Sequence, residues 1–98
     1  MSHDARLSAL NITLPDAPAP AANYVPYVRS GNLLYVSGQI SAGPDGLIKG
    51  RLGDDLDVAA GAAAARRCGL ALLAQARAAL GSLDQIVRVV KLGGFVCS

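Results

Sequence analysis

The segment Leu33–Gln39, Leu-Leu-Tyr-Val-Ser-Gly-Gln, constrains the fold more than any other stretch of this sequence. Its side chains alternate between two faces, as a β-strand requires. Leu34, Val36, Gly38 and Ile40 form a face that we expect in the core, while Leu33, Tyr35, Ser37 and Gln39 form the other. The second face turns polar where the strand ends, at Ser37-Gly38-Gln39, and a pocket can open at such a position.

The sequence predicts a β-hairpin in which this segment is the second strand. Gly31-Asn32 separates the strand from a β-forming stretch, Tyr24 to Arg29, and suits a two-residue type II′ turn. The turn sets four cross-strand pairs, namely Arg29 with Leu34, Tyr27 with Val36, Pro26 with Ser37 and Tyr24 with Gln39. Tyr24, Ser37 and Gln39 should therefore share one face. The alternative is a solvated sheet surface, and Pro26 weakens the ladder because it has no N–H to donate.

The alanine-rich stretch from Asp57 to Leu80 predicts a long helix, with Asp57 as N-cap and Gly81 as the left-handed C-terminal residue. Gly61 and Gly69 inside it suggest close packing on a sheet. We expect one apolar stripe, composed of Val58, Ala62, Ala65, Gly69, Leu72, Ala76 and Leu80. Arg66, Arg67, Gln75 and Arg77 should face water, and Cys68 should be a buried small residue.

The remaining elements are shorter. Ser2 can cap a helix that carries Leu7 and Leu10 and ends at a left-handed Asn11. The stretch from Leu14 to Ala22 contains three prolines and should be an extended arm. A tight turn is predicted at Gly43-Pro44-Asp45-Gly46, and further strands at Leu47–Leu52 and Ile86–Leu92.

The end of the sequence is physically odd. Gly93-Gly94-Phe95-Val96-Cys97-Ser98 is mostly apolar, and the predicted strand at Ile86–Leu92 is followed by neither a polar tail nor a second helix that could cover a sheet. A few strands with one helix would leave much of a sheet face uncovered, contrary to two-layer packing. We therefore expect that the chain is truncated or is completed by other subunits.

Length and charge exclude several classes of protein. A chain of 98 residues is at most one domain, and no apolar run reaches the roughly 18 to 20 residues that cross a membrane. The first residues lack the pattern of a signal peptide, and two distant cysteines do not make a disulfide framework, so we expect a cytoplasmic protein. A net charge of +2 does not indicate nucleic-acid binding, and Arg66-Arg67, the single basic pair, is interpreted as solvated rather than as a phosphate contact.

Common catalytic and metal-binding patterns are missing from the sequence. The one histidine, His3, lies in the N-terminal segment, which would have to fold back to form a Ser-His-Asp triad with Ser37. One histidine and two distant cysteines give no metal-ligand spacing, and the glycines match no phosphate-binding loop. We expect neither a metal nor a cofactor.

Several segments in order resemble the Rid family, also called YjgF-like and often labelled endoribonuclease L-PSP. They are Tyr24, then Gly31-Asn-Leu-Leu-Tyr-Val-Ser-Gly-Gln-Ile40, the Pro-Asp-Gly turn, the alanine-rich helix and Gly81-Ser-Leu-Asp-Gln-Ile-Val-Arg-Val-Val-Lys91. The similarity runs from about Tyr24 to Val96. The chain thus divides into an N-terminal helix and proline-rich arm, 1–23, and a partial Rid-like domain, 24–98. The arm resembles that of a bacterial subgroup whose function is not established.

The resemblance implies an α+β, chorismate-mutase-like fold, a mixed sheet with helices on one face, assembled as a homotrimer with clefts between subunits. In the deaminase members, a reactive enamine or imine derived from an amino acid is hydrolysed to a 2-oxo acid and ammonia. An arginine holds the substrate carboxylate, a glutamate positions water, and a tyrosine and the Ser-Gly-Gln strand line the pocket. Carried over, the substrate-binding residues are Tyr24, Ser37, Gly38 and Gln39.

The sequence also departs from the family pattern. Family deaminases carry Gly-Pro-Tyr-Ser-Gln where this chain has Ala22-Asn-Tyr-Val-Pro26, and the glutamine early in their helix is Gly61 here. The arginine and glutamate belong to the second half of the family domain, which this sequence does not contain. Arg29, Arg51 and Arg88 are interpreted as solvated, so no catalytic residue is assigned in this chain, and we expect it to have little or no activity by itself.

Three functions follow from the resemblance. The first is an enamine or imine deaminase, a hydrolase in the full-length protein, acting on a small molecule with a carboxylate. The second is a non-catalytic trimer that binds a metabolite in the same cleft. The third, endoribonuclease activity, has the least support because the net charge is small and no histidine base is placed. We expect neither nucleic acid nor membrane as a partner.

Overall fold

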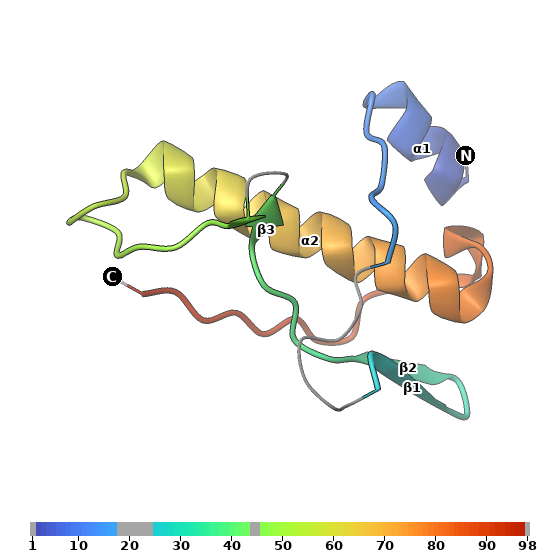
Figure 1. Ribbon diagram of the computed structural model, residues 1–98. Coiled ribbons are helices and arrows are strands. Elements are labelled where there is room, and N and C mark those ends of the chain that lie inside the picture. The colour runs from blue at the N-terminus through green and yellow to red at the C-terminus, as the bar shows by residue number, and fades with distance from the viewer. Residues whose placement is uncertain (1, 18–24, 44–45, 98) are drawn as a thin grey trace.

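The computed structural model describes residues 2–17, 25–43 and 46–97, which form an α+β arrangement (Figure 1). A long helix, α2, extends across the molecule, with α1 on one side of it and the β1–β2 hairpin on the other. The elements are α1 (His3–Ala9), β1 (Tyr27–Ser30), β2 (Leu33–Val36), β3 (Ala42–Gly43), β4 (Gly46–Leu47), α2 (Val58–Leu80) and the 3-10 helix η1 (Leu83–Gln85). None of the helices in these ranges combines the length and hydropathy that a membrane crossing requires.

The β1–β2 hairpin has the predicted register. Tyr27 pairs with Val36 and Arg29 with Leu34 in an antiparallel ladder. Gly31 has φ +58°, whereas Asn32 is not among the residues with positive φ. A left-handed φ at the first central position alone is the signature of a type II′ turn. The turn therefore sets the register, as expected.

Helix α2 begins and ends at the predicted caps. The Asp57 carboxylate accepts a hydrogen bond of 2.8 Å from the backbone N–H of Ala60. At the other end Gly81 has φ +81°, and its N–H donates to the carbonyl oxygen of Arg77 at 2.7 Å. In α1, likewise, Ser2 caps the N-terminus and Asn11 follows the helix with φ +56°.

The buried face of α2 differs from the predicted stripe. Val58 is 83% exposed, and Ala62 and Ala65 are exposed too, whereas Gln75, expected to face water, is 2% exposed. Ala76 is buried as expected. The first turns of α2 extend past the hairpin and α1, so only the C-terminal half of the helix is covered on several sides (Figure 1).

The core lies where that half of α2 meets η1, the hairpin and the segment after α1. Leu14, Ala76 and Leu83 form the buried cluster. Six half-buried residues pack against it, namely Leu7, Ile12, Leu34, Leu70, Leu73 and Ile86. Leu14 thus anchors the start of the proline-rich arm, whereas Leu10, expected to share a face with Leu7, is 55% exposed.

Two predicted strands are corrected by the structure. Of Leu47–Leu52, only Leu47 belongs to a strand, because β4 is Gly46–Leu47 and pairs with β3, a strand that was not predicted. Gly50 and Gly53 have positive φ, which ends the extended backbone there. The turn residues Pro44 and Asp45 lie outside the described residues.

The second corrected prediction concerns Ile86–Leu92, which forms no strand. It leaves η1 in an extended conformation and runs alongside α2 (Figure 1), but pairs with no strand in the described part of the chain. The apolar side chains after Ile86 are consequently exposed, with Val87 at 94% and Phe95, further along, at 104%. A strand needs a hydrogen-bonding neighbour as well as β-branched residues. The residue types are visible in the sequence, whereas the presence of a neighbouring strand is not.

Candidate functional site

Ser37 occupies the end of β2, where the hairpin ladder finishes. Its backbone N–H donates to the carbonyl oxygen of Pro26 at 2.9 Å, and its hydroxyl donates to the same oxygen at 3.0 Å. Pro26 and Ser37 therefore lie opposite each other, as the predicted register requires. Because the hydroxyl proton is engaged with Pro26, the lone pairs of Ser37 Oγ are the part that can receive a hydrogen bond from a ligand.

Gln39 is held against the same strand end. Its side-chain amide donates through Nε2 to the carbonyl oxygen of Ser37 at 3.0 Å. This contact keeps the half-buried amide close to Ser37 and leaves Oε1 as an acceptor. Gly38 between them is exposed, and a Cβ at this position would meet no atom within 4 Å. The backbone here is thus open to approach by another molecule.

A hollow of about 230 Å³ lies beside Ser37. It is lined by Val25, Tyr27, Val28, Tyr35, Val36 and Ser37, so none of its lining residues carries a charge. Gly38 and Gln39, expected at the site, do not line it. Tyr24, the fourth expected residue, lies outside the described residues, so its predicted proximity to Gln39 stays a prediction.

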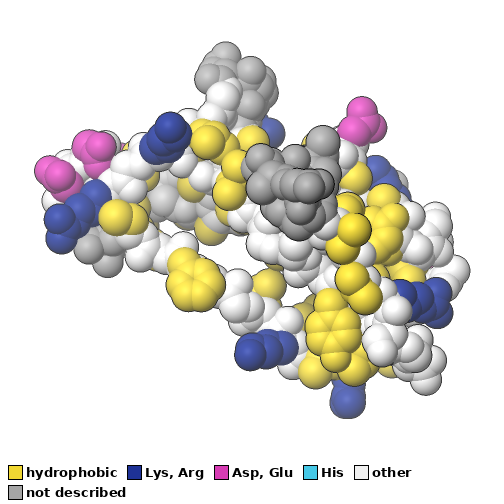
Figure 2. Space-filling view, turned by 60° about the horizontal axis from the view of Figure 1, so that its bottom comes forward, with side chains coloured by type: hydrophobic (Ala, Val, Ile, Leu, Met, Phe, Trp, Pro, Cys, Tyr) yellow, Lys and Arg dark blue, Asp and Glu magenta, His cyan; other side chains and the backbone are white. Residues whose placement is uncertain are grey.

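The sheet face that carries Ser37 points away from α2. The helix contacts β1 and β2, whose Leu34 packs against the core, while Leu33 and Tyr35 on the opposite face are 45% and 58% exposed. Figure 2 shows hydrophobic side chains gathered on the surface where the hairpin lies. The face with the candidate site is therefore apolar and exposed. Ile40, which we expected in the core, is also 55% exposed, because β2 ends at Val36.

Two tyrosines at the hollow, Tyr27 and Tyr35, were not singled out from the sequence. Period-two alternation already places Tyr35 on the face of Ser37, and that signal could have identified it. Tyr27 contributes from the other face, because the hollow extends around the end of the hairpin and takes side chains from both sides.

His3 is the first residue of α1, which lies on the other side of α2 from the β1–β2 hairpin (Figure 1). Its Nε2 is 2.8 Å from the carbonyl oxygen of Ile86, and its backbone N–H donates to Asp84 Oδ1 at 2.7 Å. The histidine thus connects α1 to η1. Within the described ranges, no group of three or more histidine, cysteine, aspartate or glutamate side chains could hold a metal ion.

Comparison with known proteins identifies the family. A family model described as "YjgF/chorismate mutase-like, putative endoribonuclease" matches residues 4–98. Protein TCP17 of Trypanosoma cruzi is 53% identical over 95 residues, which are 96% of this chain and 59% of that protein.

Two solved structures share the fold. A protein from Shewanella oneidensis MR-1, described as a "putative endoribonuclease", superposes with a TM-score of 0.77 at 37% identity and covers 85% of this chain. Atu1372 from Agrobacterium tumefaciens, described as of unknown function, gives a TM-score of 0.73 at 46% identity and covers 88%. The alignments span 56% and 53% of those two chains, so this chain corresponds to between 53% and 59% of the length of these three relatives. Because the family model covers nearly the whole sequence and the fold agrees, the chain belongs to the YjgF/chorismate mutase-like family.

Proposed function

We propose that the end of β2 contributes to a site where an enamine or imine derived from an amino acid is hydrolysed to a 2-oxo acid and ammonia. The observation that carries the proposal is Ser37, whose oriented hydroxyl lines a hollow at the end of the Ser-Gly-Gln strand. Family membership adds support, because the strand end corresponds to the pocket wall that the sequence resemblance implies.

The reaction consumes one water molecule. An enamine first gains a proton at its β-carbon and loses one from nitrogen, which gives the imine. Water then adds to the carbon of the C=N bond, its two protons pass to the nitrogen, and the C–N bond breaks to release ammonia and leave a carbonyl group. Ser37 Oγ can accept a hydrogen bond from the substrate N–H or from water, while the hydroxyl groups of Tyr27 and Tyr35 can donate. These are binding and orienting contacts.

Other groups must complete such a site. The hollow is smaller than the ~300 Å³ at which ligand pockets usually begin, and its lining holds no cation for the substrate carboxylate. We include in the proposal that the remaining wall, with a guanidinium group, comes from a neighbouring subunit of a homotrimer or from the rest of a longer chain. The exposed side chains of Val28, Leu33 and Tyr35 offer an apolar surface for that contact.

The test uses the natural full-length protein and a 2-aminoacrylate-type intermediate generated in the cuvette. We expect the protein to speed release of the 2-oxo acid and Ser37→Ala to reduce that rate. Ser30→Ala is the matched control, because Ser30 is exposed in β1 and does not line the hollow. Absence of any acceleration by a protein shown by light scattering to be a trimer would refute the deaminase proposal.

A second candidate is a trimer that binds a small metabolite without turnover. The uncharged lining of the hollow favours it, because none of the six described lining residues is a histidine, aspartate, glutamate or lysine, which most often transfer protons in enzymes. Saturable binding of a 2-oxo acid, with a raised melting temperature and no product formation, would distinguish this function from the deaminase. The cytoplasmic location expected from the sequence stays a prediction, which cell fractionation tests.

A further inference from the structure

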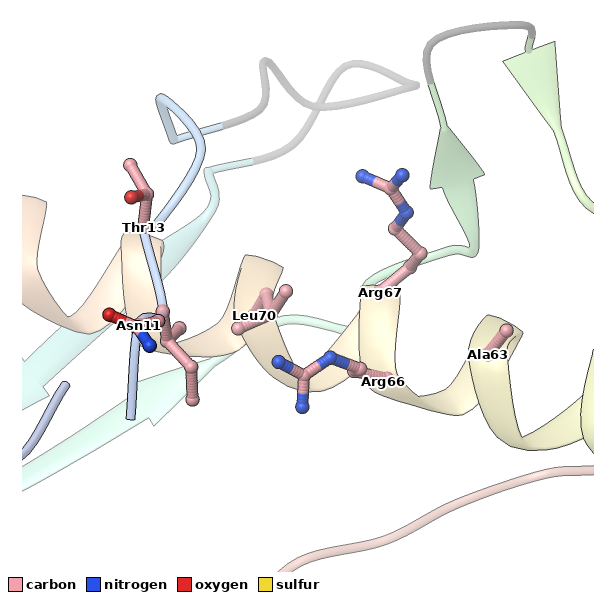
Figure 3. A pocket seen from close by; sticks show the side chains of 7 residues that line it. Asn11, Thr13, Ala63, Arg66, Arg67 and Leu70 are labelled. Atoms are coloured by element: carbon pink, nitrogen blue, oxygen red, sulfur yellow. The ribbon is translucent and has the colours of Figure 1, made fainter. Parts of the chain in front are cut away.

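A second and larger hollow lies between α2 and the segment that follows α1. Its volume is about 400 Å³, within the range of small-molecule pockets. It shares no residue with the hollow beside Ser37. Its lining residues are Asn11, Ile12, Thr13, Ala63, Arg66, Arg67 and Leu70 (Figure 3).

Two guanidinium groups dominate the electrostatics of this hollow. Arg66 and Arg67 are consecutive in α2 and exposed, and neither guanidinium group forms a hydrogen bond or ion pair with any residue that the structure describes. Among the described residues, no carboxylate lines the hollow to balance them. The two side chains point in different directions (Figure 3), but both line the hollow, and their positive charges favour an anion in it electrostatically.

The chain segment that follows α1 adds hydrogen-bonding groups to the lining of the hollow. Asn11 and Thr13 provide an amide and a hydroxyl group, and Figure 3 shows their side chains on the segment that passes α2 beside Leu70. Each guanidinium presents five N–H donors in a planar fork that fits phosphate or carboxylate oxygens. The remaining lining, Ile12, Ala63 and Leu70, is apolar.

The segment that follows α1 is held in place by local contacts. Asn11 has φ +56°, and its N–H donates to the carbonyl oxygen of Ser8 at 3.1 Å. The N–H of Ile12 donates to the carbonyl oxygen of Leu7 at 2.9 Å, and Ile12 packs against the core. The C-terminal cap of α1 therefore orders this wall before any ligand binds, which reduces the entropy lost on binding.

We propose that this hollow is a binding site for a small phosphate monoester with an apolar body. Two positive charges match the charge of nearly −2 that such a phosphate carries at neutral pH, and the apolar lining fits the body of the ligand. The site is separate from the strand-end hollow and goes beyond the hydrolytic function proposed above.

Phenyl phosphate is the probe, titrated into the natural full-length protein at low ionic strength by calorimetry and by amide NMR shifts. We expect saturable binding that Arg66→Gln and Arg67→Gln each weaken by about tenfold, as the loss of one charge-assisted hydrogen bond implies. Arg29→Gln is the matched control, because Arg29 is exposed in β1 and lines neither hollow. Circular dichroism of each variant would check that it is folded.

Two further measurements separate phosphate recognition from general attraction of anions. Benzoate carries the same ring with a single charge and should bind more weakly than phenyl phosphate, and phenyl phosphate binding should strengthen as pH rises through about 6, where the dianion forms. Equal loss of affinity in Arg29→Gln, equal affinity for benzoate, or no saturable binding at millimolar phenyl phosphate would each overturn the proposal.

Discussion

Ser37 and Pro26 are joined by two hydrogen bonds to one acceptor. The backbone N–H and the hydroxyl of Ser37 both donate to the carbonyl oxygen of Pro26, at 2.9 Å and 3.0 Å. The backbone bond carries the hairpin register one pair beyond the ladder, and the hydroxyl bond fixes the side chain at the hollow. Pro26 has no N–H to return a bond to Ser37, so the hydroxyl bond is the second link across this pair.

Removing the hydroxyl should loosen the strand end. We expect Ser37→Ala to lower the free energy of unfolding by about 0.5–1.5 kcal/mol, the usual contribution of one hydrogen bond at a part-buried site. Urea denaturation followed by circular dichroism measures the change. Ser30→Ala, at an exposed position of β1, should change stability by less than about 0.5 kcal/mol. Equal effects of the two substitutions would contradict a specific role for the Ser37 bond.

The hairpin turn should be sensitive to a side chain at Gly31. Its φ of +58° is left-handed, and no atom would lie within 4 Å of an added Cβ, so any penalty comes from the backbone alone. We expect Gly31→Ala to lower stability by about 1–2 kcal/mol. Gly38→Ala is the control, because Gly38 has equally open surroundings without a positive φ. Thermal unfolding of both variants would reveal the difference, and similar melting temperatures would argue against the type II′ turn.

The two glycines inside α2 should respond differently to alanine. A Cβ at Gly61 would lie 2.5 Å from Leu52 Cδ2, whereas a Cβ at Gly69 would meet no atom within 4 Å. Gly69→Ala should therefore raise stability by about 0.5–1 kcal/mol through helix propensity. Gly61→Ala should gain less or lose stability, because Leu52 must move. A larger gain at Gly61 than at Gly69 in urea unfolding would show that the helix and Leu52 are not in close contact.

Among the described apolar residues, Leu83 should be the one whose truncation to alanine lowers stability most. It is 2% exposed in η1 and belongs to the cluster with Leu14 and Ala76. We expect Leu83→Ala to lower stability by about 2–5 kcal/mol, because the cavity left behind adds to the lost burial. Val87→Ala, at a position 94% exposed, should be nearly neutral. The comparison requires equilibrium unfolding, and a small effect at Leu83 would place the core elsewhere.

The local elements of this protein follow from the sequence alone. Gly31-Asn32 determined the turn type and the pairing of Tyr27 with Val36, and Asp57 and Gly81 determined where α2 begins and ends. These features depend on backbone conformation and on hydrogen bonds between residues a few positions apart. Such interactions are present in the chain before it folds into a tertiary structure, so residue type is sufficient to predict them.

The tertiary structure decided what each element touches. Gln75 is buried and Val58 exposed because α1, η1 and the hairpin lie against the C-terminal half of α2 and leave its first turn uncovered. Residues 86–92 pair with no strand among the described residues, because a strand requires a neighbour from a distant part of the chain. Arg66 and Arg67 are exposed, as the sequence indicates, but they also line a hollow with Asn11 and Thr13, since the cap of α1 directs that segment past α2. Contacts between distant residues fix these outcomes, and sequence periodicity within one element does not encode them.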